Sequence, residues 1–191
     1  MSNAKHLSFG TEIWELGKPL KHKLARLASE LRYLTPSGKS EYPITVTMWV
    51  FCDLETSTGR KLVETALEFL AESATHSRVA IIPTDRSKCS SKQEFLAAVN
   101  ANNLSKAMKL LQSFDQSTCK EDSNFAESDH AQLMKLVGIS KGENSVVANG
   151  RVIDDITEEN VFERGDWTLL EKFNYDNCAK HFGTQLAFIS L

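Results

Sequence analysis

The chain has 191 residues, with 22 Lys and Arg against 25 Asp and Glu, and 41% of its residues are hydrophobic. This length and composition suit one globular domain with its own core, and exclude collagen-like and low-complexity classes. The formal net charge of -3 gives no electrostatic reason to bind nucleic acid or an anionic membrane. No apolar run approaches the roughly 20 residues that a membrane-spanning helix needs.

The two ends of the chain suggest an excised domain. Residues 1–4 are typical of a remnant left by expression cloning, and the chain stops on the apolar run 188–191. We expect residues 5–191 to form one domain cut from a longer protein. Within it we expect an N-terminal helical extension at about 18–35 and a helical insertion at about 88–140.

The first predicted element is an amphipathic helix from about Lys18 to Leu34. Its leucines recur at spacings of four and three, which is the period of one helix face: Leu20, Leu24, Leu27, Leu31 and Leu34. Basic residues fill the opposite face, which we expect to be solvated. Thr35-Pro36 ends the helix.

A strand–helix–strand unit follows. The run from Ile44 to Cys52 is β-branched, aromatic and nearly unbroken, which is typical of a central strand buried on both faces. A helix with an apolar face over Leu62–Ala74 comes next, and then a short strand from Arg78 to Ile82. These lengths predict a parallel strand pair joined by a right-handed helical crossover.

We expect the insertion at 88–140 to be entirely helical. Ser91-Lys92-Gln93-Glu94 has the pattern of a capping box before a helix, and a second helical period runs from Leu104 to Phe114. Ser128 or Asp129 begins a third helix, which closes at Gly138.

The last elements complete an α/β fold. Asn149-Gly150 lies between two short β runs, 145–148 and 151–153, and predicts a hairpin with a type I′ turn. Asp166 is the expected cap of a final helix that carries Trp167, Leu169, Leu170 and Phe173. A βαβ half and a ββα half around a central mixed sheet make a thioredoxin-like fold, with the N-terminal helix and the helical insertion added.

The cysteines and histidines do not suggest a metal centre. Cys52, Cys89, Cys119 and Cys178 are far apart, and no His stands at ligand spacing to any of them. Cys89 and Cys119 flank a helical region and are able to pair in an oxidising compartment. Asn103, in the triplet Asn103-Leu104-Ser105, is a candidate for N-linked glycosylation.

The thioredoxin-like order of helices and strands does not by itself indicate redox activity. Redox members of the fold need a thiolate at the start of the helix after the central strand, with a resolving cysteine nearby. Here Glu55 stands where the second cysteine would be, and Asp53 and Glu55 are expected to raise the pKa of Cys52. No proline follows Pro83, although active members have one before the third strand.

Part of the sequence resembles a known family. The segments that carry the resemblance are Val146–Ile153 with its central Asn-Gly-Arg, Phe162, Asp166, Leu169-Leu170-Glu171, and Val46–Phe51 followed by Gly59-Arg60. Together they resemble a thioredoxin-like domain of UDP-glucose:glycoprotein glucosyltransferase, and the helical insertion makes the third such domain the nearest match. Asp154-Asp155 departs from the Gly-Pro that family members commonly carry there.

The resemblance implies a parent enzyme of the endoplasmic reticulum lumen that adds one glucose to the high-mannose glycan of misfolded glycoproteins. UDP-glucose and a divalent metal such as calcium would serve a separate catalytic domain. None of those catalytic residues corresponds to a position in this chain. We therefore expect a non-catalytic, redox-inactive module without cofactor or metal, whose partners are misfolded glycoproteins and other domains of the parent, and neither nucleic acid nor membrane.

A sensor of misfolding needs apolar surface of its own, since unfolded glycoproteins expose apolar side chains. The predicted client-binding patch consists of Phe95, Leu96, Leu104, Met108, Leu111, Phe114 and Phe125. Phe125 is the strongest candidate for exposure because its neighbours in sequence are polar. Three alternatives remain open: these residues form the core of the insertion, the domain is a structural spacer, or it is a redox or glutathione-type enzyme with Cys52 as its only nucleophile.

Overall fold

The structure is a computed structural model. It describes residues 9–12, 18–36, 44–72, 76–117, 119–123, 125, 128–154 and 156–176. The predictions about residues 1–4, the chain end at 188–191 and Cys178 lie outside these residues. None of the helices in the described ranges is long and apolar enough to cross a bilayer.

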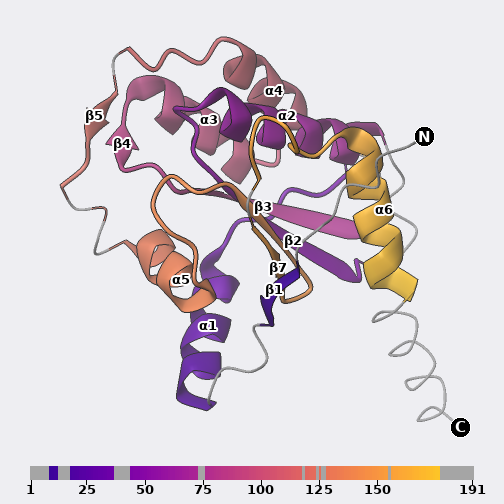
Figure 1. The fold of residues 1–191 in the computed structure, drawn as a ribbon. Helices are drawn as coiled ribbons and strands as arrows, with labels where there is room; N and C mark the ends of the chain where they lie inside the picture. The colour runs from indigo at the N-terminus through magenta and orange to yellow at the C-terminus, as the bar shows by residue number, and fades with distance from the viewer. Residues whose placement is uncertain are drawn as a thin grey trace, which may run out of the picture.

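Two sheets and six helices make up the described chain (Figure 1). In chain order the elements are β1 (Phe9–Glu12), α1 (Lys18–Glu30), β2 (Val46–Cys52), α2 (Ser57–Glu72), β3 (Ser77–Pro83), β4 (Ser87–Lys88), α3 (Ser90–Asn100), α4 (Leu104–Gln112), β5 (Lys120–Glu121), α5 (Asp129–Val137), β6 (Ser145–Ala148), β7 (Arg151–Ile153) and α6 (Arg164–Asn174). The main sheet has the order β1-β7-β6-β2-β3, and β4 pairs with β5 in a separate two-stranded sheet.

The predicted βαβ unit is confirmed. Strands β2 and β3 run parallel, in register from Val46 opposite Ser77 to Cys52 opposite Pro83, and α2 makes the crossover. The nearly unbroken apolar run of β2 is explained by two separate cores. Met48 and Val50 pack into the core on one face of the sheet, and Trp49 and Phe51 pack into the core on the other.

The predicted hairpin is also confirmed. Strands β6 and β7 pair antiparallel around Asn149 and Gly150, whose φ angles are 46° and 88°. Both residues occupy the left-handed region that a type I′ turn requires. The pairing of β1 with β7 was not predicted, because the four residues of β1 carry no apolar alternation.

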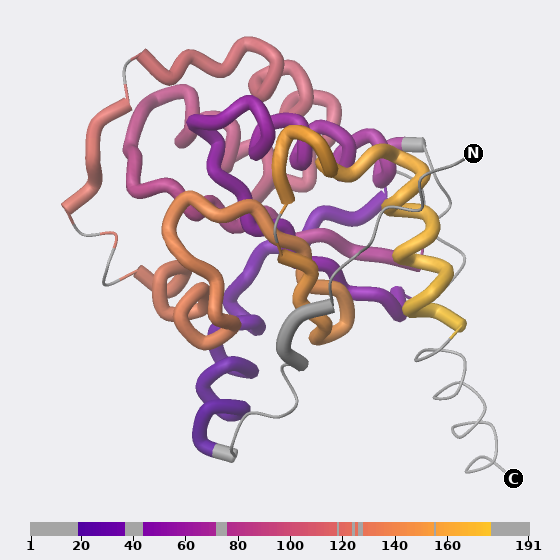
Figure 2. Tube along the Cα trace, viewed as in Figure 1, coloured from indigo at the N-terminus to yellow at the C-terminus, as the bar shows by residue number. Residues whose placement is uncertain are grey.

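The helices form a layer on each face of the main sheet (Figure 2). Buried residues of α2, α3, α4 and α6 share one core, and those of α1 and α5 share the other. The predicted all-helical insertion is therefore corrected in two ways. It contains the small β4–β5 sheet, and its helices divide between the two faces, with α3 and α4 beside α2 and with α5 beside α1.

Helix ends agree with the sequence patterns only in part. Ser128 caps α5 by accepting a hydrogen bond from Ala131 N–H, and Gly138 closes that helix with φ of 79°, as predicted. The predicted capping box at Ser91 is wrong, because the N-cap of α3 is Cys89, two residues earlier, and its side chain makes no capping hydrogen bond. Asp166 lies within the first turn of α6, where its carboxylate accepts the backbone N–H of Glu163 at 2.8 Å.

Candidate functional site

The seven residues of the predicted client-binding patch do not form one exposed surface. Three of them are buried in the core between α2, α3 and α4: Phe95, Leu104 and Leu111. Because α3 and α4 pack on each other and α4 packs on α2, the expected exposure of these three side chains is corrected to burial. They are buried, as the alternative expected, but they belong to the domain core shared with β2, α2 and α6 and not to a separate core of the insertion.

The other four residues lie nearer the surface, on two different faces. Leu96, Met108 and Phe114 are half-buried against the α2–α3–α4 core. Phe125 is also half-buried rather than exposed, and it packs against the core on the opposite face, with α5. A patch that combines Phe125 with the first three residues is therefore excluded by the sheet that lies between them.

Helix α6 carries two exposed apolar side chains, of which Phe173 also has the Arg151 guanidinium over its ring at 5.4 Å. Leu169 is 62% exposed and Phe173 is 40% exposed, and they lie four residues apart on one side of the helix. Trp167 and Leu170 occupy the buried side of the same helix. The sequence pattern already indicated exposed apolar side chains on this helix, since its apolar residues occupy more than the single stripe that burial requires.

Cys52, the alternative nucleophile, is completely buried at the end of β2. Burial raises the pKa of the Cys52 thiol well above its usual value, and the nearby Asp85 carboxylate raises it further. Lys92 opposes this shift, and Asp53 adds a smaller increase. A thiol that is both inaccessible and held neutral is a poor nucleophile, so the geometry argues against chemistry at this position.

Asn144 precedes β6, where redox thioredoxins carry their proline. Its Oδ1 atom accepts the backbone N–H of Asp53 at 2.9 Å and so anchors the loop after β2. Gly59, in the first turn of α2, lies against the same loop. A Cβ atom at Gly59 would come within 1.9 Å of the Asp53 carbonyl oxygen and 2.8 Å of Asn144 Oδ1. The loop, Asn144 and the first turn of α2 are therefore packed so closely that no side chain fits at Gly59.

Beneath this loop lies a buried ion pair that the sequence did not reveal. Lys92 on α3 pairs with Asp85 after β3, and their side chains are 9% and 2% exposed. Asp85 also accepts hydrogen bonds from Ser87 Oγ at 2.6 Å and from Leu54 N–H at 3.2 Å. Lys92 in turn donates to the Ser87 carbonyl oxygen at 2.8 Å. The pair thereby connects α3, the end of β3 and the loop after β2.

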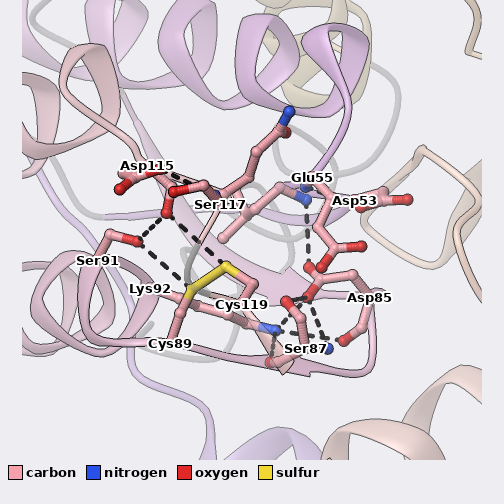
Figure 3. Close-up of a disulfide and its surroundings, with 12 residues drawn as sticks. Asp53, Glu55, Asp85, Ser87, Cys89, Ser91, Lys92, Asp115, Ser117 and Cys119 are labelled. Atoms are coloured by element: carbon pink, nitrogen blue, oxygen red, sulfur yellow. Dashed lines mark hydrogen bonds and ion pairs between the residues drawn. A yellow bond between two sulfur atoms is a disulfide. The ribbon is translucent and has the colours of Figure 1, made fainter. Parts of the chain in front are cut away.

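A disulfide links Cys89 to Cys119 beside this ion pair (Figure 3). It closes a separation of 30 residues and holds the segment before β5 to the start of α3. Ser91 Oγ strengthens the same junction by donating to the Asp115 carbonyl oxygen at 2.8 Å. Figure 3 shows the disulfide and the Lys92–Asp85 pair on the same edge of the domain, where both hold α3 to other segments.

The described residues contain no cluster of side chains that could bind a metal ion. No three His, Cys, Asp or Glu side chains converge there as an ion would require. The edge of the sheet that carries catalysis in redox thioredoxins thus consists of a buried thiol, a tightly packed loop and a satisfied ion pair.

A family model described as a thioredoxin-like domain matches residues 18–187. The chain belongs to the thioredoxin-like domain family.

Curated relatives agree with the resemblance found in the sequence. The chain is 29% identical over 147 residues to UDP-glucose:glycoprotein glucosyltransferase of Drosophila melanogaster, which covers 68% of this chain and 9% of the relative. It is 26% identical over 191 residues to UDP-glucose:glycoprotein glucosyltransferase 2 of Homo sapiens, which covers 83% of this chain and 12% of the relative. The chain therefore spans about a tenth of the length of these relatives.

Solved structures share the fold. The Trx3 domain of UGGT in its detergent-unbound form superposes with a TM-score of 0.56 at 21% identity, covering 78% of this chain and 97% of that domain. The detergent-bound form gives 0.53 at 20% identity, covering 74% and 100%. The thioredoxin-like fold expected from the order of elements is confirmed.

Proposed function

We propose that this chain is a non-catalytic module of a longer glycoprotein glucosyltransferase and that it binds apolar segments of misfolded glycoproteins. The observation that carries the proposal is the exposed pair Leu169 and Phe173 on α6. Two large apolar side chains one turn apart, in a domain whose other large side chains are mostly buried, form a surface suited to apolar partners. The half-buried Leu96, Met108 and Phe114 are secondary candidates.

The energetics suit weak and promiscuous contact. Covering about 300 Å² of apolar surface contributes about 7 kcal/mol to binding. The loss of translational and rotational freedom on association offsets most of this free energy. The resulting weak affinity suits a sensor that must bind and release many different clients. One relative of this fold has been solved in a detergent-bound form, and detergents resemble apolar segments in carrying an exposed aliphatic chain.

The proposal assigns glucose transfer to another part of the parent. There UDP-glucose and a divalent metal such as calcium would be held by a separate catalytic domain, and this module would contribute recognition. The buried, neutral thiol of Cys52 supports a role without redox chemistry. The parent would act in the lumen of the endoplasmic reticulum, a compartment in which the Cys89–Cys119 disulfide persists.

Binding to a denatured glycoprotein tests the proposal. The 191-residue chain is immobilised, and binding of a chemically denatured glycoprotein is compared with binding of its native form. We expect Leu169→Glu and Phe173→Ser to weaken binding of the denatured form about fivefold or more, because each removes part of the apolar surface. Thr168→Glu is the matched control, since it adds a charge at an exposed position of the same helix. Equal binding by all variants, or no preference for the denatured form, would leave the structural spacer as the better account.

Secretory expression tests Asn103 as an acceptor of N-linked glycan. Asn103 is exposed at the start of α4, and its Oδ1 atom accepts the backbone N–H of Lys106 at 3.0 Å. Secretory expression should add a glycan to its amide nitrogen, visible as an endoglycosidase-sensitive mass shift. Ser105→Ala removes the acceptor triplet and keeps the helix cap. A protein that carries no glycan in the secretory pathway would contradict the assignment of Asn103.

A further inference from the structure

A small cavity on the other face of the sheet is not used by the proposed function. It has a volume of about 230 Å³ and lies between α5 and the segments that flank the β4–β5 sheet. Phe125, Met134 and Ile139 give it an apolar floor, and Arg86, Lys135 and Lys141 give it a basic rim. Helix α6, with its exposed pair, packs on the opposite core. The cavity is therefore independent of the surface proposed to bind clients.

The rim cations are largely available to an external anion. All three are exposed, and in the described part of the chain no carboxylate lies within ion-pair distance of Arg86 or Lys135. Only Lys141 has such a neighbour, Glu121 at 3.7 Å, and both groups of that pair are more than half exposed. A local excess of positive charge around an apolar floor stands out in a chain whose net charge is -3.

The size of the cavity restricts what it can hold. It is smaller than the roughly 300–1,000 Å³ typical of sites for drug-sized ligands, and suits one large side chain. Its cations come from three segments: the loop before β4, the last turn of α5 and the loop after α5. Three separate cations match several carboxylates spaced along a chain better than the single charge of a small amphiphile. Arginine adds the ability to bind a carboxylate through two parallel hydrogen bonds.

We propose that this cavity binds a segment of a partner protein that presents one large apolar side chain flanked by carboxylates. The apolar side chain would occupy the floor formed by Phe125, Met134 and Ile139. The flanking acids would pair with Arg86, Lys135 and Lys141. This chemistry adds charge selectivity, which the exposed pair on α6 does not supply, and it defines a second, acidic class of partner.

A labelled peptide tests the proposal on the 191-residue chain. The probe is a fluorescent nonapeptide with a central Phe between Asp and Glu residues, titrated by fluorescence anisotropy. We expect saturable binding that weakens about tenfold or more when the central Phe of the peptide is replaced by Ser. The double variant Arg86→Gln with Lys135→Gln should weaken binding about five- to tenfold. The matched control is Lys88→Gln with Lys120→Gln, which removes two exposed charges from the β4–β5 sheet and should change binding less than twofold.

A variant that fills the cavity tests the proposal in a second, independent way. Ala131 lines the cavity on α5, and Ala131→Phe should abolish binding while the thermal unfolding midpoint stays within a few degrees of wild type. Equal affinity for the Phe and Ser peptides would show attraction by charge alone and overturn the proposal. So would equal effects of the two double variants, or the absence of saturable binding. Binding of dodecanoate without binding of the peptide would assign the cavity to a small amphiphile instead.

Discussion

Replacing Lys92 by Met tests how the edge of the domain beside the disulfide is held together. The variant keeps an unbranched side chain one atom shorter and removes the charge, so the Asp85 carboxylate stays buried without its cation. Asp85 is 2% exposed, and its remaining partners are the Ser87 hydroxyl and two backbone N–H groups. Removing one partner of a buried pair costs about 3–5 kcal/mol, a large part of the 5–15 kcal/mol that typically stabilises a domain.

Urea unfolding followed by tryptophan fluorescence measures this loss. With a slope of about 2 kcal/mol per molar urea, the unfolding midpoint of Lys92→Met should fall by about 2 M. The matched control is Lys61→Met, which breaks an exposed pair with Glu64 at 2.8 Å. That loss should be below about 1 kcal/mol, because solvent screens an exposed pair.

A double variant separates the loss of attraction from the stranding of a charge. Lys92→Met combined with Asp85→Leu leaves no buried charge, and it should recover most of the stability lost in the single variant. Should Lys92→Met shift the midpoint no more than Lys61→Met does, the pair would not support this edge and the reasoning would be wrong. Failure of the double variant to recover stability would instead assign the loss to the hydrogen bonds that the two side chains make with the backbone, those of Lys92 to carbonyl oxygens and those of Asp85 from N–H groups.

Three further predictions concern the same edge of the sheet. Gly59→Ala should destabilise the domain by about 3 kcal/mol or more, since its Cβ would lie 1.9 Å from a backbone oxygen. The control is Gly165→Ala, which should be neutral or stabilising by up to about 1 kcal/mol, because no atom lies within 4 Å of its Cβ. Replacing Cys89 and Cys119 by Ser should cost about 3–4 kcal/mol in urea unfolding, because the bridge closes a separation of 30 residues, and an unchanged midpoint would contradict this. Burial raises the pKa of Cys52, so the folded protein keeps a proton that the unfolded chain releases. The contribution of Cys52 to stability should therefore decline above the pH of about 8.5 at which a free thiol ionises, and alkylation of the Cys52 peptide, read by mass spectrometry, should be slow until urea unfolds the chain.

The sequence by itself determined the elements whose signals are local. A short apolar run rich in β-branched and aromatic residues is typical of a central strand covered on both faces, and β2 is that strand. Asn149-Gly150 specified the hairpin, because few other residue pairs accept positive φ at both positions. The sequence, with Glu55 in place of a resolving cysteine, argued against two-cysteine redox chemistry but left a single-cysteine enzyme open.

Only the tertiary structure decided which apolar side chains reach solvent. Phe95 and Leu169 belong to similar helical patterns, yet Phe95 is buried between three helices and Leu169 is 62% exposed, because only the neighbours of a helix determine which of its faces is covered. The Lys92–Asp85 pair and the cavity with the basic rim were also beyond the sequence. Each combines residues from separate segments, and the free energy of such contacts depends on distance and burial, which no local pattern encodes.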